Sequence, residues 1–172
     1  MGKILAFTNQ KGGSGKTTLS ANLAVLWANS QYKVAVIDAD HQKSLTYWIE
    51  ARKKYYGEGD IGIDVYAYNS HSLGEDIKKI KRKYNFIIID SPPSITYDTI
   101  QIVRNADRVI VPALPSPVDL MATIPFLNLT KQERKKSIVF LNIVLPRFPL
   151  SEAMILRLRY AGARIARSRI SS

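Results

Sequence analysis

Short hydrophobic runs alternate along the chain with longer stretches in which apolar side chains recur at helical spacing. The runs predict strands over residues 4–8, 34–38, 63–66, 86–90, 108–111 and 138–144. The longer stretches predict helices over residues 16–30, 44–56, 73–83, 96–105, 119–127 and 151–160. Strand and helix therefore follow one another through the whole chain, which is the order expected of an α/β protein.

The predicted strands are apolar at nearly every position, as in VAVID at 34–38 and FIIID at 86–90. A strand that alternates apolar and polar residues has one face in water, whereas these runs are typical of strands covered on both faces. The pattern therefore predicts a doubly wound, mostly parallel α/β sheet flanked by helices. In such a sheet a ligand is expected beyond the carboxyl ends of the strands.

Length and composition limit the classes of protein that remain. The chain has 172 residues, of which 46% are apolar and 23% charged, and we expect a single domain over residues 1–172. The sequence contains neither an apolar run of membrane-spanning length nor a secretory signal pattern, so we expect a cytoplasmic protein. With no cysteine and two histidines, the chain has no disulfide, thiolate metal site or thiol nucleophile, and a histidine-rich metal site is disfavoured.

Positive charge is concentrated near the C-terminus. The whole chain carries 25 Lys and Arg against 14 Asp and Glu, a formal charge of +11. Residues 131–172 contain 10 basic and 2 acidic residues, whereas residues 1–130 contain 15 and 12. A basic region of this kind favours a polyanionic partner, either nucleic acid or an acidic membrane surface. A solvated basic face without a partner is the alternative.

A glycine-rich loop follows the first predicted strand. Residues 11–18 read KGGSGKTT and lead into a predicted helix. In the common template G-x-x-x-x-G-K-[ST], the first glycine position would fall on Gln10. The glycines still allow consecutive backbone N–H groups to surround phosphate oxygens at the positive end of a helix. Lys16 would reach the β and γ phosphates of a nucleotide, and the Thr17 hydroxyl would bind Mg²⁺.

The same eight residues resemble the deviant Walker A motif, KGGxGKT[ST], of the ParA/MinD superfamily of P-loop ATPases. In that superfamily the additional lysine, here Lys11, reaches across a two-fold dimer to the partner's nucleotide. The resemblance therefore implies an active site completed only in an ATP-bound homodimer, with Lys11 and Lys16 as catalytic residues. It also implies a P-loop NTPase fold, ATP, ADP and Mg²⁺ as cofactors, and nucleotide contacts from Gly12, Gly13, Ser14, Gly15, Lys16, Thr17 and Thr18.

Three carboxylates follow predicted strands at the same edge of the sheet. Asp38 and Asp40 end the second apolar run, and Asp90 ends the fourth. An isolated carboxylate at a strand end is often a turn residue, but beside a phosphate-binding loop it can hold Mg²⁺ or orient water. Asp90 resembles the Walker B aspartate, so the expected metal residues are Thr17, Asp38 and Asp90. Asp40 resembles the switch aspartate that supports hydrolysis, although His41 replaces the proline that usually follows it.

Later segments also resemble the superfamily. Residues 106–120, ADRVIVPALPSPVDL, are similar to the strand and proline loop of its plasmid and chromosome partition branch, where Asp119 would cap the next helix. Asn142 matches an asparagine that reads the adenine edge in relatives, and a strand-end turn residue is the alternative. Residues 166–170 resemble a strand after which relatives continue through one or two more helices. We therefore expect the basic C-terminal region, residues 131–172, to be shorter than in relatives.

The resemblance to the ParA branch implies particular partners. There the ATP-bound dimer binds DNA without sequence preference, and a ParB-like centromere-binding protein stimulates hydrolysis and release. We expect a small, nucleoid-associated partition ATPase that lacks the N-terminal DNA-binding extension of larger relatives. Phosphate contacts from the basic C-terminal region would supply the DNA affinity. The candidates are Lys135, Lys136, Arg147, Arg157, Arg159, Arg164, Arg167 and Arg169, with Lys131 and Arg134 beside them.

Three other functions stay open at this point. A MinD-like membrane-associated positioning ATPase would need a C-terminal amphipathic helix, but the large apolar residues of the tail are only Ile165 and Ile170. A nucleotide-binding remnant that does not hydrolyse ATP is kept open by His41 and by the short C-terminus. A small P-loop kinase would need an acceptor pocket and a cationic lid, to which we assign no segment.

Overall fold

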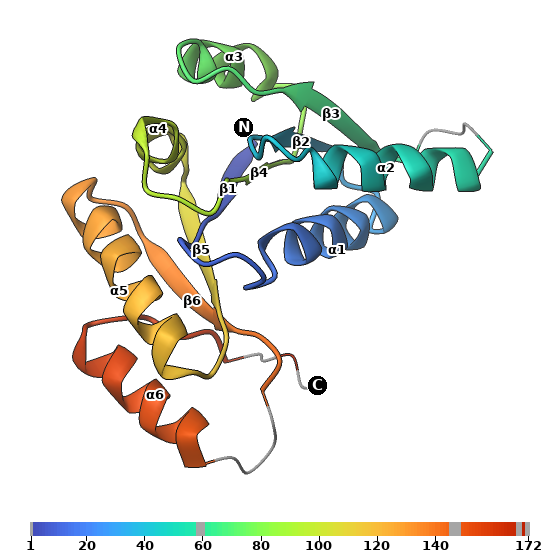
Figure 1. The fold of residues 1–172 in the computed structure, drawn as a ribbon. Helices are drawn as coiled ribbons and strands as arrows, with labels where there is room; N and C mark the ends of the chain where they lie inside the picture. The colour runs from blue at the N-terminus through green and yellow to red at the C-terminus, as the bar shows by residue number, and fades with distance from the viewer. Residues whose placement is uncertain (1, 58–60, 145–148, 168–169, 171–172) are drawn as a thin grey trace.

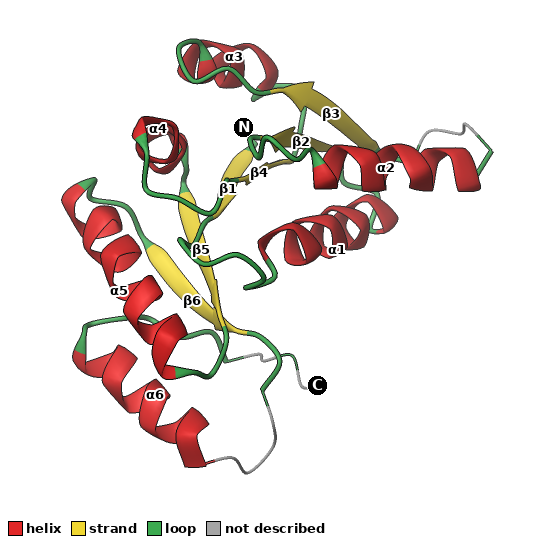
Figure 2. Cartoon of the chain, in the orientation of Figure 1, coloured by secondary structure: helices red, strands yellow, loops and turns green. Residues whose placement is uncertain are grey.

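Strands and helices alternate through residues 2–57, 61–144, 149–167 and 170, which are the residues that the computed structural model describes. The strands are β1 (Lys3–Phe7), β2 (Val34–Asp38), β3 (Ile63–Ala67), β4 (Phe86–Asp90), β5 (Arg108–Ala113) and β6 (Ser137–Leu141). The helices are α1 (Lys16–Asn29), α2 (Ser44–Tyr55), α3 (Leu73–Ile80), α4 (Tyr97–Asn105), α5 (Pro117–Gln132) and α6 (Pro149–Tyr160). Each strand and helix predicted from the hydrophobic pattern is present, and the ends differ by a few residues (Figure 2).

The strands form one parallel sheet in the order β3-β2-β4-β1-β5-β6. Because all of them run in the same direction, their carboxyl ends meet at one edge. The register sets Phe7 beside both Asp90 and Ile110 at the end of β1, and Asp38 beside Asp90. The predicted doubly wound parallel sheet is confirmed, and the loop after β1 begins at its centre.

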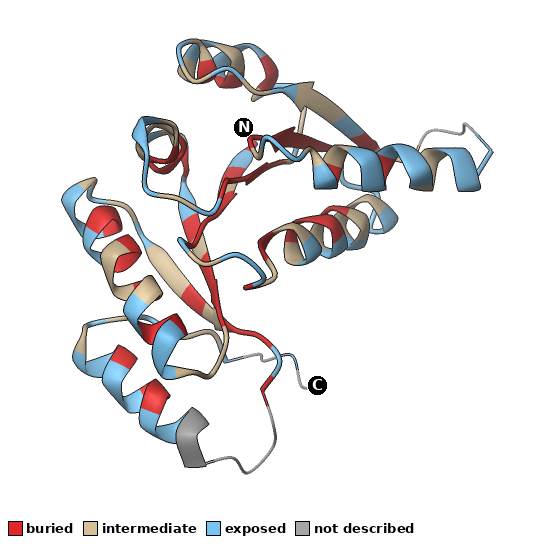
Figure 3. Ribbon diagram, viewed as in Figure 1, coloured by how far each residue is buried: buried red, intermediate tan, exposed pale blue. Residues whose placement is uncertain are grey.

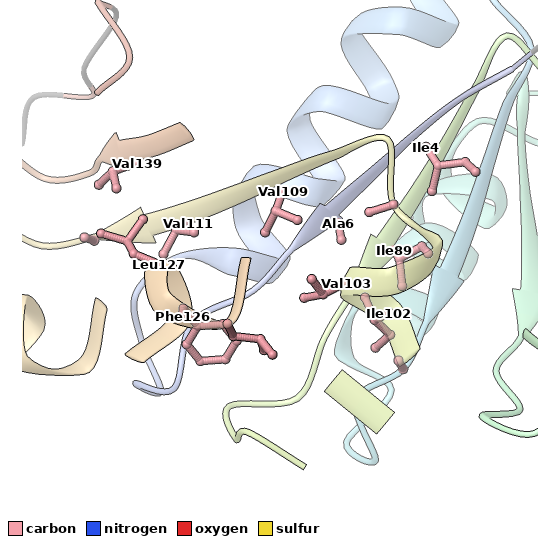
Figure 4. Close-up of a cluster of buried hydrophobic side chains, with 14 of the residues drawn as sticks. Ile4, Ala6, Ile89, Ile102, Val103, Val109, Val111, Phe126, Leu127 and Val139 are labelled. Carbon is pink, nitrogen blue, oxygen red and sulfur yellow. The ribbon is translucent and has the colours of Figure 1, made fainter. Parts of the chain in front are cut away.

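Helices lie on both faces of the sheet. In Figure 1, α1 and α2 lie on one side, while α3, α4 and α5 lie on the other with α6 packed outside α5. On the first side, Val36 and Ile88 of the sheet pack with Ala24 of α1 and Leu45 of α2. The second core is larger, and the buried side chains of α4 and α5 pack there against β1, β4, β5 and β6 (Figure 4).

Coverage of the sheet is uneven, which corrects one expectation. Every residue of β2 is buried, as expected for a strand covered on both faces. On β5 and β6, however, Ile110 and Phe140 are only half-buried, whereas Val111 and Val139 on the opposite face are buried. Figure 3 shows much of β6 in the colour of intermediate burial. The reason is that α1 packs on β1, β2, β3 and β4, and no other described helix covers that face of β5 and β6.

The chain beyond α6 returns along the outer edge of β6. Ile165 forms a parallel bridge with Val139, and the Ile170 N–H donates to the Leu141 carbonyl at 3.3 Å. The other described residues of this segment, 166, 167 and 170, do not lie in a strand. The strand expected over residues 166–170 is therefore not formed by its described residues. None of the helices in the described part of the chain is long and apolar enough to span a bilayer.

Candidate nucleotide site

The loop between β1 and α1 has a backbone that requires glycine. Gly13 and Gly15 have φ angles of 72° and 95°, in the left-handed region that side chains with a Cβ rarely adopt. At Gly15 an added Cβ would also lie 2.3 Å from Nδ2 of Asn142, which follows β6. The loop is therefore held close against the end of a strand that is distant in the sequence.

The backbone N–H groups of the loop are free to bind an anion. Within the described residues, none of the N–H groups of residues 12–18 donates a hydrogen bond to an acceptor of the protein. These residues lead into the first turn of α1, where N–H groups have no partner inside the helix and the helix dipole is positive. A hollow of about 310 Å³ adjoins them, lined by the loop together with Asp40, Gln42, Ser44 and Pro93. A row of unpaired N–H groups beside such a hollow fits a phosphate chain.

Lys16 lies inside this loop and is almost fully buried, with 6% of its surface exposed. Its ammonium donates to the Lys11 carbonyl at 3.2 Å. Burial lowers the pKa of Lys16, and the nearby carboxylates of Asp90 and Asp40 act in the opposite direction. The charge of this lysine is therefore incompletely compensated, which favours an anion as its further partner.

Asp90, at the end of β4, accepts a hydrogen bond from the Thr17 hydroxyl at 2.7 Å. The side chain is 1% exposed, and burial raises its pKa to about 7, against the hydrogen bond from Thr17 and with a contribution from the Asp38 charge. A buried carboxylate next to a hydroxyl is poorly neutralised by the protein alone. Both oxygen types are ligands that Mg²⁺ prefers, so Thr17 and Asp90 fit a magnesium ion that also binds phosphate oxygens.

Asp38 lies beside Asp90, but its oxygens are already used within the protein. Oδ2 accepts from the backbone N–H and from the hydroxyl of Thr46, both at 2.9 Å, and Oδ1 accepts from the Asp40 N–H at 3.2 Å. Asp38 thus fastens the first turn of α2 to the end of β2. The described residues contain no group of three or more His, Asp and Glu side chains that could hold a metal ion. A direct metal contact from Asp38 stays a prediction.

Asp40 belongs to a short turn that borders the hollow. Its Oδ1 accepts from the Gln42 N–H at 3.0 Å, and its carbonyl accepts from the Lys43 N–H at 3.1 Å. The Lys43 ammonium donates to the Asp38 carbonyl at 2.7 Å. These bonds shape the turn although His41 stands where a proline is usual. The carboxylate of Asp40 is thereby placed in the same hollow as the glycine loop, as the sequence predicts.

Lys11 contacts its own chain rather than solvent alone. Its ammonium lies 2.6 Å from Oδ2 of Asp119, which is in the first turn of α5. The sequence predicts Asp119 as the capping residue of this helix, and that prediction is wrong because the helix begins earlier in the chain. Ser116 is the N-cap, and its hydroxyl accepts from the Asp119 N–H at 3.2 Å while donating to the Asp119 carboxylate. The Ser116 hydroxyl thus caps one N–H of the first turn and is itself held by the Asp119 carboxylate.

Asn142, which follows β6, contacts the glycine loop through its side chain. Its Nδ2 donates to the Ser14 carbonyl at 3.2 Å, and its Oδ1 accepts from the Ile143 N–H at 3.1 Å. The side chain is buried. The contact with adenine stays a prediction, and the bond to Ser14 is one that the sequence did not reveal, since the two residues are 128 positions apart.

The basic candidates of the C-terminal region lie in two separate places. Arg157 and Arg159 are exposed on α6, and Arg164 and Arg167 are exposed on the tail that follows it. Lys136 is exposed at the start of β6, next to Lys135, whose ammonium donates to the Ala106 carbonyl at 3.0 Å, and Lys131 donates to the Ala161 carbonyl at 2.8 Å. Arg147 and Arg169 lie outside the described residues.

Sequence comparison places the chain among nucleotide-binding proteins. Residues 5–105 match the family described as CobQ/CobB/MinD/ParA nucleotide binding domain. The maintenance of carboxysome distribution protein A of Halothiobacillus neapolitanus is 32% identical over 87% of this chain and 70% of its own length. The sporulation initiation inhibitor protein Soj of Bacillus subtilis is 30% identical over 65% of this chain and 58% of its own length.

Solved structures share the fold. The apo structure of McdA from Cyanothece superposes with a TM-score of 0.83 at 23% identity, covering 100% of this chain and 87% of that one. Cobyrinic acid a,c-diamide synthase from Mycobacterium smegmatis, solved with bound ADP and magnesium, superposes with a TM-score of 0.78 at 20% identity, covering 93% of this chain and 82% of that one.

Proposed function

Because the chain belongs to the CobQ/CobB/MinD/ParA family of nucleotide-binding domains, we propose that it is a ParA-type positioning ATPase that binds ATP with Mg²⁺. One observation carries this proposal. The unpaired N–H groups of residues 12–18, the buried ammonium of Lys16 and the carboxylate of Asp40 all border one hollow at the carboxyl edge of the sheet. Solved relatives of the same fold hold ATP, or ADP with magnesium.

Each residue has a role in this proposal. Residues 12–18 surround the phosphates, with their backbone N–H groups and the Lys16 ammonium neutralising charge. Thr17 and Asp90 hold Mg²⁺, which neutralises phosphate charge when bound, and Asp38 keeps the neighbouring turn in place. Asp40 orients the attacking water. Lys11 leaves Asp119 and reaches the nucleotide of a second copy, so that hydrolysis requires a dimer.

We further propose that the protein distributes a cargo along DNA. The ATP-bound dimer binds DNA without sequence preference, and a ParB-like partner stimulates hydrolysis and release. The relatives named for carboxysome distribution, sporulation initiation and chromosome partitioning support a positioning role with different cargoes. The similarity of residues 106–120 to the proline loop of the partition branch favours a plasmid or chromosome as the cargo. Such a protein would act in the cytoplasm, associated with the nucleoid.

Light scattering of the purified protein with ADP and with a slowly hydrolysed ATP analogue tests the dimer. We expect a single subunit with ADP, a dimer with the analogue, and a single subunit in both cases for Lys16→Gln. The role of Lys11 is best tested in Lys11→Ala/Asp119→Asn, because this double variant leaves no unpaired buried carboxylate. Lys78→Ala, which removes an exposed lysine of α3, is the control. Pairing of the double variant as well as wild type would contradict the role of Lys11.

Phosphate release separates an ATPase from a nucleotide-binding remnant. We expect slow release by the protein alone and faster release with random duplex DNA and a cognate partner. A nucleotide-binding remnant would show no phosphate release above background in any of these conditions. Binding to liposomes with nucleotide, in the absence of binding to DNA, would favour a membrane-associated ATPase instead.

A further inference from the structure

The edge of the sheet opposite the glycine loop carries a row of exposed basic side chains. All strands of a parallel sheet begin at one edge, so residues that are distant in sequence become neighbours there. Exposed cations lie at or just before the start of five adjacent strands. They are Lys33 at β2, Arg82 and Lys83 at β4, Lys3 at β1, Arg108 at β5, and Arg134 and Lys136 at β6. We call these seven residues the basic row.

Backbone bonds fix the members of the row beside one another. The Lys3 N–H donates to the Asn85 carbonyl, and the Asn85 N–H donates to the Lys33 carbonyl, both at 2.9 Å. On the other side, Arg108 pairs with Leu5 in the ladder, and the Val109 N–H donates to the Lys136 carbonyl at 3.0 Å. With neighbouring strands about 4.8 Å apart, five strands place the row over roughly 19 Å.

The positive charge of the row exceeds the negative charge of its acidic neighbours. None of its seven cations forms a salt bridge within the described part of the chain. Of the nearby carboxylates, Asp107 lies 3.3 Å from Lys81 and also interacts electrostatically with Lys3, while Glu133 lies 2.8 Å from Arg104, outside the row. Asp64 accepts from the Tyr84 hydroxyl at 2.6 Å. Seven cations beside these three carboxylates leave an excess of positive charge, which attracts a polyanion.

We propose that the basic row binds the phosphate backbone of double-stranded DNA. A length of roughly 19 Å corresponds to about six base-pair steps at 3.4 Å each, so several phosphates can meet several cations of the row at once. A membrane surface fits less well. The exposed large apolar side chains of the described residues lie outside the row, and those near it are Tyr32 and Tyr56 at its Lys33 end, so there is little to insert into lipid along its length.

The position of the row has a consequence for the dimer, and this step rests on the proposed function. Two copies that meet through their glycine loops leave their basic rows on the two outer ends of the pair. One straight duplex cannot contact both ends. The ATP-bound dimer therefore bridges two DNA segments and is held by both. A single subunit holds one segment more weakly, so hydrolysis, which separates the two copies, releases the DNA.

Fluorescence anisotropy of a short labelled duplex of random sequence, without nucleotide, tests the row itself. We expect Lys3→Gln/Arg108→Gln to weaken binding about tenfold and to reduce the slope of log affinity against log salt by about 2. The matched control is Lys54→Gln/Lys78→Gln, which removes the same charge from exposed positions of α2 and α3 and should bind as wild type does. An equal or larger loss in the control would overturn the assignment. The same variants are also sedimented with phosphatidylcholine–phosphatidylserine vesicles. If the row substitutions abolish vesicle binding but leave DNA binding unchanged, the partner of the row is a membrane and not DNA.

Capture of a fluorescent duplex on beads that carry a second, biotinylated duplex tests bridging. We expect capture with the slowly hydrolysed ATP analogue, none with ADP, and none for Lys16→Gln, which keeps the row and should bind a single duplex as the ADP-bound subunit does. A dimer that is visible by light scattering but captures nothing would overturn the outward placement of the two rows. If the analogue gives no dimer, the proposed function fails, and the anisotropy of the row variants still decides whether the row binds DNA.

Discussion

Lys11 in the glycine loop and Asp119 in the first turn of α5 form an ion pair with 2.6 Å between Nζ and Oδ2. The pair is asymmetric, because the Asp119 side chain is 0% exposed and that of Lys11 is 33% exposed. The other donors to Asp119 are neutral, the Ser116 hydroxyl and the Leu114 N–H. Within the described residues, Lys11 is therefore the only cation bonded to the buried Asp119 carboxylate. The lysine that we propose acts on a second copy is held by its own chain.

Removing Lys11 should destabilise the fold. Lys11→Ala leaves the Asp119 charge buried without a cation, a change that costs about 3 kcal/mol in comparable pairs. Adding Asp119→Asn should recover most of that loss, because the amide carries no charge. Urea unfolding without nucleotide measures both variants. Additive effects of the two substitutions would show that the ion pair contributes nothing to stability.

Removing the charge of Asp119 should strengthen the proposed dimer. Lys11 cannot contact Asp119 and the nucleotide of another copy at once, so the ion pair competes with dimer formation. We expect Asp119→Asn to dimerise with the ATP analogue at a several-fold lower protein concentration, as followed by light scattering during dilution. Glu152→Gln, an exposed change on α6, is the control. Unchanged dimerisation of Asp119→Asn would mean that the ion pair does not compete.

Asn142→Ala should weaken nucleotide binding whatever the base. Both ends of the amide are bonded within the protein, to Ser14 and to the Ile143 N–H. Loss of the bond to the glycine loop is expected to reduce affinity about three- to tenfold, the worth of one hydrogen bond. Titration calorimetry with ATP and with GTP should show the same factor for both. A loss confined to ATP would instead support the contact with adenine.

Asp90→Asn should stabilise the protein at high pH when Mg²⁺ is chelated. Burial raises the pKa of Asp90 from 3.8 to about 7, so the folded chain holds this proton more tightly than the unfolded chain. The stability from this group is complete below pH 4 and is lost as the pH rises through 7. The variant should therefore gain up to about 4 kcal/mol over wild type at pH 8 and little at pH 4. Urea unfolding at several pH values checks this, and a pH-independent difference would contradict the raised pKa.

Asp40→Ala should separate binding from hydrolysis. The carboxylate borders the hollow, yet it forms none of the bonds that hold the glycine loop. We expect nucleotide affinity close to wild type, phosphate release about 100-fold slower or more, and a dimer that persists with ATP. Asp64→Ala, at the opposite edge of the sheet, is the matched control. Normal hydrolysis by the Asp40 variant would remove this residue from the mechanism.

Local patterns were enough to predict the secondary structure and the glycine loop. The continuous apolar runs at 34–38 and 86–90 became buried strands, because burial on both faces leaves no position for a polar side chain. KGGSGKTT at 11–18 became the turn before α1 and the first residues of that helix, because the conformation of the turn depends on glycines that are neighbours in sequence. Order along the chain also predicted that the carboxylates of Asp38, Asp40 and Asp90 would gather at one edge.

Contacts between distant residues were beyond those patterns. The pairing of Lys11 with Asp119 joins residues 108 positions apart, and nothing local distinguishes that carboxylate from a helix cap. Counting charge along the chain predicted a basic region at residues 131–172, but five of the seven residues of the basic row come from earlier parts of the chain, which meet only where the strands begin.

The sequence by itself determined which segments form strands and helices and which residues form the glycine loop, since both follow from the spacing of neighbouring residues. Only the tertiary structure decided which side chains share an ion pair, a hydrogen bond or a surface. The physical reason is that the strand order β3-β2-β4-β1-β5-β6 sets those neighbours, and this order results from packing the whole chain into one core.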